Sequence, residues 1–233
     1  QAGKYPMLIS ARAYAKSETP NWYLQHYNSN HIQWENNFGF TYRFLGGATI
    51  AYPTKWVKAK IDFSFENQTN PIFVSASDWC PHQYMGSVQI FTGDVTADIT
   101  TPWVNLENRA VIQYSTRDSI MPVPLLILQH RLYYHGTWFK ALDAQIGVDL
   151  RYFTRYKAPV LCPETGMFAT QQTTNIGNYP WMSVYANFYV RSILRALPTC
   201  QLLVRHQEHR VSDHAGVSDE QGCVPRGIGM ALL

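Results

Sequence analysis

Apolar and polar residues alternate strictly along several stretches of the first 193 residues. The clearest stretch runs from Lys140 to Tyr152, and similar ones cover residues 56–66, 182–190 and 7–16. A period of two residues places successive side chains on opposite faces of a β-strand, whereas a helix needs a period near 3.6. The pattern therefore predicts four long strands, each with one apolar and one polar face.

Less regular segments lie between these strands. We expect further strands over residues 22–27, 37–45, 87–91, 108–115 and 125–134, and turns rich in Gly, Asn, Ser and Pro at 28–30, 46–47, 66–71, 115–119 and 173–178. In particular, Gly46 and Gly47 are interpreted as a turn and not as a phosphate-binding loop. The segment from Tyr156 to Asn175 is long and Pro-containing, so we expect either an extracellular loop or a constriction folded inward.

The lengths of the regular strands favour a membrane protein. They run for about 9–13 residues, whereas strands of soluble proteins average ~5–6 and a tilted membrane-spanning strand needs about 9–11. The expected fold is all-β: an antiparallel up-and-down transmembrane β-barrel over residues 1–193, present as its C-terminal portion, with an irregular tail. The alternative is a soluble or surface-attached β-sandwich that buries the apolar faces in a core and binds glycans through exposed Trp and Tyr.

Aromatic residues fall near the ends of the predicted strands, where a ring can lie at the boundary between lipid and water. These residues are Trp22, Tyr23, Trp56, Trp103, Tyr133, Tyr134, Trp138, Tyr152, Tyr179 and Trp181.

In a barrel the two faces have different surroundings. The candidates for the lipid-facing side are Val57, Ile61, Phe63, Leu142, Ile146, Val148, Leu150, Val184 and Phe188. The candidates for the lumen are Lys58, Lys60, Asp62, Glu66, Asp143, Gln145, Asp149, Arg151, Asn187 and Arg191. Because the lumen candidates carry both signs of charge, they do not indicate which ions would pass preferentially.

Composition narrows the class of protein further. Charged residues make up 15% of the 233 residues and aromatic residues 14%, which argues against a disordered chain. A net charge of +3 without a basic run predicts no nucleic-acid partner. The four cysteines include no CxxC pair, so they predict neither a disulfide framework nor a zinc site.

Residues with catalytic or metal-binding chemistry are present but scattered. His206 and His209 form an HxxH without further ligands, and Cys80 lies two residues before His82 in an aromatic stretch. Asp143 and Asp149 share a strand face but lie roughly 20 Å apart at about 3.3 Å per residue, too far to act as a pair. We therefore expect no enzymatic activity, no metal and no cofactor.

The segment from about residue 107 to residue 191 resembles an outer-membrane β-barrel porin family of Bacteroidota. The resemblance lies in RLYYHGTWFKALDAQIGVDLRYFTRYKAPVLCPETGMF and in IGNYPWMSVYANFYV, which follow the family's order of strands, loop and turn. Leu161 and Cys162 depart from it, because the family more often has an aromatic and a small polar residue there. The resemblance implies a porin-like protein of the bacterial outer membrane that lets small solutes diffuse passively. Its implied partners are outer-membrane lipid, the barrel-assembly machinery and those solutes, and it implies no oligomeric state.

The tail does not follow this family. The chain starts without an initiating Met or signal peptide, so we expect a fragment, and alternation stops after about residue 191. Members of the family typically end in a segment such as FLTMPGYPMNRGVFRAGLAWHF. The stretch VSDHAGVSDEQGCVPRGIGMAL can be encoded by codons that yield FLTMPGYPMNRGVFRAGLAWH when they are read one base later. The hypothesis is that residues 194–233 are an out-of-frame tail without a native barrel strand. The nucleotide sequence tests it.

Overall fold

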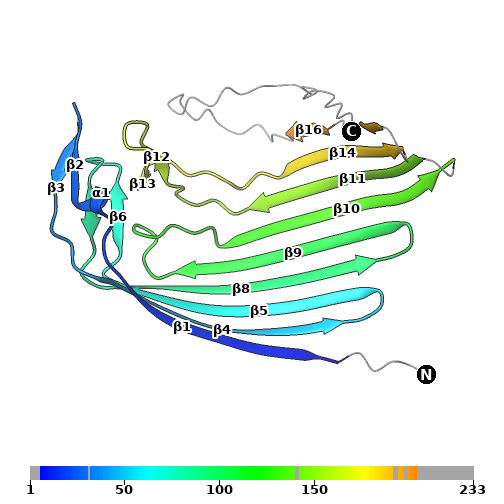
Figure 1. Cartoon of the computed structure of the whole chain (residues 1–233), viewed down its shortest axis with the longest axis horizontal. Helices are drawn as coiled ribbons and strands as arrows, with labels where there is room; N and C mark the ends of the chain where they lie inside the picture. The colour runs from blue at the N-terminus through cyan, green and yellow to red at the C-terminus, as the bar shows by residue number, and fades with distance from the viewer. Residues whose placement is uncertain (1–5, 31, 140–141, 191–193, 197–198, 204–233) are drawn as a thin grey trace.

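The computed structural model describes residues 6–30, 32–139, 142–190, 194–196 and 199–203. Long antiparallel strands form one large sheet in the order β1-β4-β5-β8-β9-β10-β11-β14-β15, and β16 also pairs with β14 (Figure 1). The large sheet consists of β1 (Leu8–Glu18), β4 (Thr41–Pro53), β5 (Val57–Thr69), β8 (Ser87–Thr100), β9 (Val104–Ser115), β10 (Leu126–Trp138), β11 (Leu142–Phe153), β14 (Trp181–Val190), β15 (Leu194–Ala196) and β16 (Thr199–Leu203). The expected all-β antiparallel fold is confirmed.

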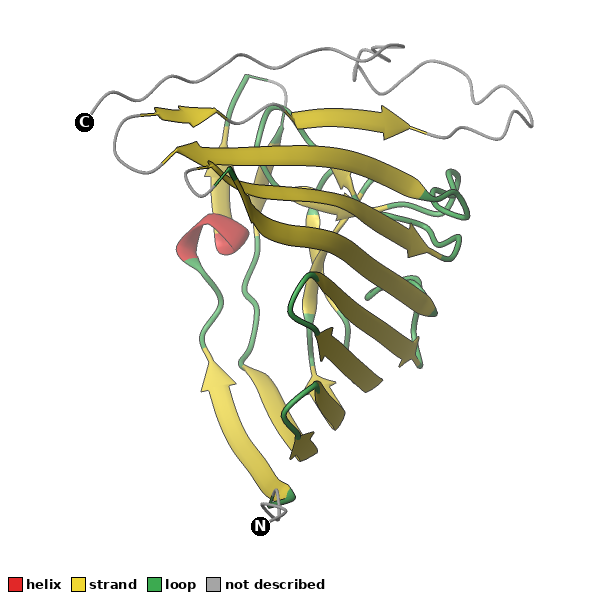
Figure 2. Cartoon of the chain, turned by 90° about the vertical axis from the view of Figure 1, so that its right-hand side faces the viewer, coloured by secondary structure: helices red, strands yellow, loops and turns green. Residues whose placement is uncertain are grey.

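The sheet is open rather than closed on itself. Its pairing runs from β1 to the strands beside β14, and no pairing among the described residues joins these two margins. Figure 2 looks roughly along the strands and shows the sheet bent into a trough. A closed barrel is therefore not what the described part of the chain forms by itself.

Connections at the two ends of the sheet differ in length. Tight hairpins join β4 to β5, β8 to β9 and β10 to β11 at one end. The β4–β5 and β8–β9 hairpins share a sequence motif, Thr-x-Trp-Val, at residues 54–57 and 101–104. In both, the Thr backbone N–H and hydroxyl donate to the Val carbonyl, which closes the turn. The sequence thus builds short turns at this end and places a Trp on each of the two.

The opposite end carries four long connections. They contain α1 (Trp22–Gln25), β2 (His26–Asn28), β3 (Gln33–Glu35), β6 (Ile72–Ser75), β7 (Pro81–Gln83), β12 (Val160–Leu161) and β13 (Phe168–Thr170). The strands β12, β13, β6 and β7 form a small sheet in that order, in which β6 and β13 pair in parallel. We call the four connections together the cap. Figures 1 and 2 show α1 and these short strands at the end of the trough, within the arc of the sheet.

Hydrogen bonds join all four connections of the cap. The Tyr27 hydroxyl donates to the Glu164 carbonyl, and Gln83 exchanges hydrogen bonds with the backbone of Gly39 at 2.9 Å. Gln172 donates to the Ser119 carbonyl at 3.4 Å. Fully or nearly buried side chains gather here too, among them Pro71, Val74, Cys162 and Ala169. The cap, and not the apolar side of the large sheet, thus holds much of the buried core.

Three sequence predictions differ from the structure. Gly46 and Gly47 do not form a turn but lie inside β4, where the missing side chain of Gly47 lets Arg12 cross the strand. Residues 22–25 form one helical turn, and Asn21 caps its N-terminus because its side chain accepts a hydrogen bond from the Tyr23 N–H. Beyond residue 191, where no strand was expected, β15 and β16 pair with β14, because the free edge of β14 offers unpaired backbone groups.

Among the described residues, no helix is long and apolar enough to cross a membrane.

Candidate functional site

The pairing register gives the large sheet two chemically different faces. Residues directly opposite each other on neighbouring strands share a face, so the register extends the alternation of each strand across the sheet. We call the two sides the apolar face and the polar face. The candidates predicted to face lipid all lie on the apolar face: Val57, Ile61, Phe63, Leu142, Ile146, Val148, Leu150, Val184 and Phe188.

The apolar face is open to its surroundings. Ile61 on β5 is 54% exposed and Ile112 on β9 is 58% exposed, although both strands are paired on both sides within the sheet. A β-sandwich would cover such residues with a second sheet. Among the described residues no second sheet covers them, so the sandwich alternative does not fit.

The lumen candidates all lie on the polar face except Arg191, which lies outside the described residues. They are Lys58, Lys60, Asp62, Glu66, Asp143, Gln145, Asp149, Arg151 and Asn187. The structure does not bring Asp143 and Asp149 together as a pair. Asp143 accepts a hydrogen bond from the Thr137 hydroxyl at 2.6 Å, and Asp149 binds Arg151 at 3.0 Å.

Arginine–carboxylate pairs cross the polar face from strand to strand. Arg12 on β1 reaches over β4 and binds Asp62 on β5 with two hydrogen bonds of 2.6 and 2.7 Å. Gly47 makes this reach possible, because a Cβ there would lie 3.2 Å from the Arg12 guanidinium and 3.0 Å from the Phe63 carbonyl oxygen. The Thr49 hydroxyl donates to the same carboxylate. Two parallel N–H···O bonds are the strongest geometry for such a pair.

Further pairs continue the pattern along the sheet. Arg43 binds Glu66 at 2.6 Å on β4 and β5, and Arg109 binds Asp94 at 2.6 Å on β8 and β9. The polar face carries Lys and Arg residues alongside a matching set of Asp and Glu residues, so it has no dominant sign of charge. The cations are Arg12, Lys16, Arg43, Lys58, Lys60, Arg109, Arg131 and Arg151, and the anions are Glu18, Asp62, Glu66, Asp94, Asp98, Glu107, Asp143 and Asp149.

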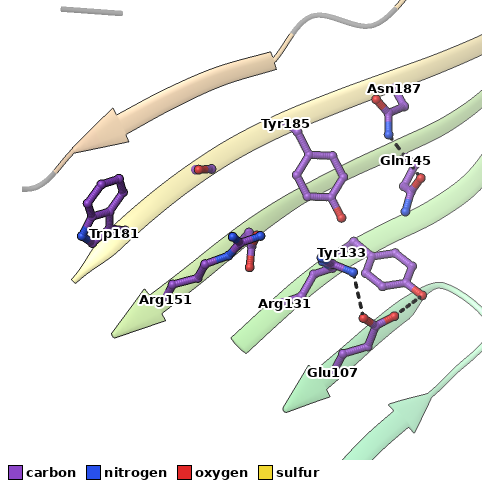
Figure 3. Close-up of a pocket in the computed structure, with 10 residues that line it drawn as sticks. Glu107, Arg131, Tyr133, Gln145, Arg151, Trp181, Tyr185 and Asn187 are labelled. Carbon is purple, nitrogen blue, oxygen red and sulfur yellow. Dashed lines mark hydrogen bonds and ion pairs between the residues drawn. The ribbon is translucent and has the colours of Figure 1, made fainter. Parts of the chain in front are cut away.

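A hollow of about 560 Å³ opens on the polar face over β9, β10, β11 and β14 (Figure 3). Its wall combines charged, amide and aromatic side chains. It is lined by Glu107, Arg131, Tyr133, Gln145, Asp149, Arg151, Trp181, Ser183, Tyr185 and Asn187. Three lumen candidates of β11 and Asn187 of β14 therefore meet in one place.

Hydrogen bonds order the side chains around the hollow. Glu107 accepts from Arg131 at 3.1 Å and from the Tyr133 hydroxyl at 3.2 Å. Arg131 stands directly opposite both Glu107 and Asp149 in the register, so it lies between two carboxylates. The Asn187 amide donates to Gln145 at 3.4 Å, which is at the weak end for such a bond.

Gly147 shapes the floor of this hollow. It lies on β11 opposite both Tyr133 and Tyr185. A Cβ at this position would come within 2.6 Å of the Tyr185 ring and 2.8 Å of the Tyr133 Cβ. The Tyr185 ring therefore occupies the space above β11 that a side chain of residue 147 would fill.

Sequence reasoning missed six residues of this hollow: Glu107, Arg131, Tyr133, Trp181, Ser183 and Tyr185. Tyr133 and Trp181 were assigned only to the aromatic ends of strands. The strands β9 and β10 alternate less regularly than β11, since Asn108 and His130 interrupt their apolar faces. If the pairing register had been known, the alternation of β11 would have identified the residues of β9, β10 and β14 that share its polar face.

The described residues hold no group of three or more metal-ligating side chains that could bind an ion. Cys80 and His82 do not form a nucleophile pair there, because His82 instead contacts Asp78 at 2.7 Å. Partial burial and the neighbouring Asp78 raise the pKa of the Cys80 thiol, which disfavours the reactive thiolate. His206 and His209 lie outside the described residues.

The fold and this face define an all-β protein with a large amphipathic antiparallel sheet, apolar and exposed on one side and lined with paired charges on the other. A family model described as "Putative porin" matches residues 3–194. The chain therefore belongs to this porin family, and the resemblance drawn from the sequence is confirmed. No curated protein matches the chain.

Proposed function

We propose that the large sheet is part of the wall of a transmembrane β-barrel in the bacterial outer membrane, through which small solutes diffuse passively. The observation that carries this proposal is the exposed apolar face, which continues across β1, β4, β5, β8, β9, β10, β11 and β14 opposite a charge-lined face. In this arrangement the apolar face contacts lipid hydrocarbon, and the polar face contacts water in the lumen. In the complete barrel, pairing of further strands would close the two margins.

Aromatic residues bracket the apolar face at a spacing that suits a bilayer. Trp103 is 73% exposed in the β8–β9 hairpin and Tyr114 is 57% exposed near the other end of β9. At about 3.4 Å per residue and a tilt of ~45°, the segment between them spans roughly 26 Å of membrane, close to the ~25 Å apolar band of such barrels. Trp56 and Phe139 expose rings in the other two hairpins of that end.

The unequal ends suggest an orientation. Outer-membrane barrels have short periplasmic turns and longer extracellular loops. The hairpin end with Trp56, Trp103 and Phe139 would then face the periplasm, and the cap would face the outside. In this proposal outer-membrane lipid and the barrel-assembly machinery are partners, and the protein transports solutes rather than catalysing a reaction.

The test starts from the protein purified in detergent together with the further strands that close the proposed barrel. We expect it to fractionate with outer membranes, to migrate differently on SDS gels before and after heating, and to give stepwise ion currents in planar lipid bilayers. Because cations and anions balance on the polar face, currents in KCl should show weak selectivity between K⁺ and Cl⁻. A protein that stays in the soluble fraction and gives no current would contradict the proposal.

A further inference from the structure

The hollow on the polar face differs chemically from the rest of that face. Elsewhere the face carries arginine–carboxylate pairs, whereas here Trp181, Tyr133 and Tyr185 add aromatic rings from β14 and β10. Its volume of about 560 Å³ lies in the range of small-molecule sites. A lumen that only held water would not need aromatic rings at this position.

The charges around the hollow cancel within the wall. Glu107 binds Arg131 at 3.1 Å, and Arg151 binds Asp149 at 3.0 Å. A solute with net charge would therefore meet an attractive and a repulsive group at similar distance. It would also have to break a pair already formed. A neutral solute incurs neither cost.

Hydrogen-bonding capacity remains for such a solute. Among the described residues, the amides of Gln145 and Asn187 share one bond of 3.4 Å and use few of their donors and acceptors, which leaves the others for a ligand. Arg151 is 60% exposed and keeps guanidinium N–H groups that its single bond to Asp149 does not use. The wall thus offers donors, acceptors and ring faces together.

Resting on the function proposed above, we propose that this hollow is a transient binding site for neutral sugars that pass through the pore. A sugar ring presents an apolar C–H face, which packs against aromatic rings, and a rim of hydroxyls, which donate and accept hydrogen bonds. Tyr185 lies over Gly147, and Trp181 lies on the same face of β14 beyond Ser183, so both rings are placed along one strand.

The experiment records single-channel currents of the reconstituted protein while maltose, glycylglycine or inorganic phosphate is added. Maltose should interrupt the current in a saturable way, at concentrations where the zwitterion and the anion do not. Trp181→Ala and Tyr185→Ala should each raise the half-saturating maltose concentration roughly tenfold. Tyr185→Phe, which keeps the ring, should change it much less.

Matched controls separate this role from general damage. Tyr14→Ala removes a Tyr that is 43% exposed on the polar face of β1, outside the hollow, and should leave the maltose concentration unchanged. Gly147→Ala should weaken maltose binding by displacing the Tyr185 ring. The ion current of each variant without sugar shows that its pore has assembled.

The outcomes are distinct. If the wild-type protein gives no current, the proposed pore itself fails. If current flows but maltose leaves it unchanged, or phosphate binds better than maltose, the proposed pore is supported and the proposed sugar-binding site is wrong. An equal loss of maltose binding in Tyr14→Ala and Tyr185→Ala would also contradict the proposed sugar-binding site.

Discussion

At the residue scale, a polar pair lies in the middle of the apolar face on β9 and β10. His130 on β10 stands opposite Asn108 on β9, and the His130 Nδ1 lies 2.7 Å from the Asn108 Oδ1. The Asn108 amide also donates to the Ala97 carbonyl at 3.1 Å. The His130 Nδ1 and both polar atoms of the Asn108 amide thus have partners inside the sheet, which suits a hydrocarbon environment.

The pair should behave as one unit. Asn108→Ala leaves the His130 imidazole without its partner on the lipid-facing side and should lower the free energy of unfolding in lipid vesicles by about 1–3 kcal/mol. The double change Asn108→Ala with His130→Leu removes both polar groups and should recover most of this loss. Urea unfolding of the wild type, both single variants and the double variant measures the coupling. Additive losses would contradict the interpretation.

A second residue-scale prediction concerns Cys80 in the cap, between β6 and β7. The pKa of its thiol is raised by partial burial and by the Asp78 carboxylate. Because a raised pKa lowers the thiolate fraction at a given pH, Cys80 should react with iodoacetamide at pH 8 more slowly than in the urea-unfolded chain. Asp78→Asn should speed the reaction.

Peptide mass spectrometry can follow alkylation of Cys80 alone across a pH series. Asp118→Asn changes an exposed carboxylate in another connection and should leave the rate unchanged. A Cys80 rate that ignores Asp78→Asn would show that the carboxylate does not influence the thiol.

At the scale of the element, β11 shows how one strand serves two environments. Ile146 lies on the apolar face and Gln145 on the polar face, although they are neighbours in sequence. Ile146→Arg should destabilise the folded protein in vesicles by about 2–4 kcal/mol, because it places a charge in hydrocarbon. Gln145→Arg should cost much less, since the polar face meets water in the proposed pore.

Unfolding titrations of both variants in lipid vesicles check this prediction. Equal losses for Ile146→Arg and Gln145→Arg would mean that the two faces of β11 do not meet different solvents. Leu132→Arg, on the apolar face in the middle of β10, should behave like Ile146→Arg.

At the scale of the whole molecule, the cap joins segments that are far apart in sequence. The connection that contains residues 156–175 contributes β12 and β13, and β13 pairs with β6 from the connection after β5. Because the cap lies within the arc of the sheet in Figure 2, we expect it to narrow the mouth of the pore.

Replacing residues 157–175 with a short Gly-Ser linker should therefore increase single-channel conductance. Heat-modifiable migration on SDS gels serves as the control that the barrel still assembles. An unchanged conductance in an assembled variant would mean that this connection is an extracellular loop only and constricts nothing.

The alternation in the sequence was enough to predict the long strands of β1, β5, β11 and β14 and the two faces of each. It works because side-chain direction in a strand depends only on position along the chain. The strands β8 and β9 were predicted too short, and the glycines of β4 were misinterpreted as a turn. Local sequence could not show that Arg12 of a distant strand needs the space above Gly47.

Local sequence is enough to predict an antiparallel β protein, because a period of two and strand length are local properties, and the ordered motifs over residues 107–191 are what indicate a porin family. Which side chains meet depends instead on the pairing of distant segments. The register between strands brings Glu107, Arg131 and Tyr185 to one hollow, and the folding of the long connections brings β6 to β13. Both depend on contacts between residues far apart in the chain, which no local pattern encodes.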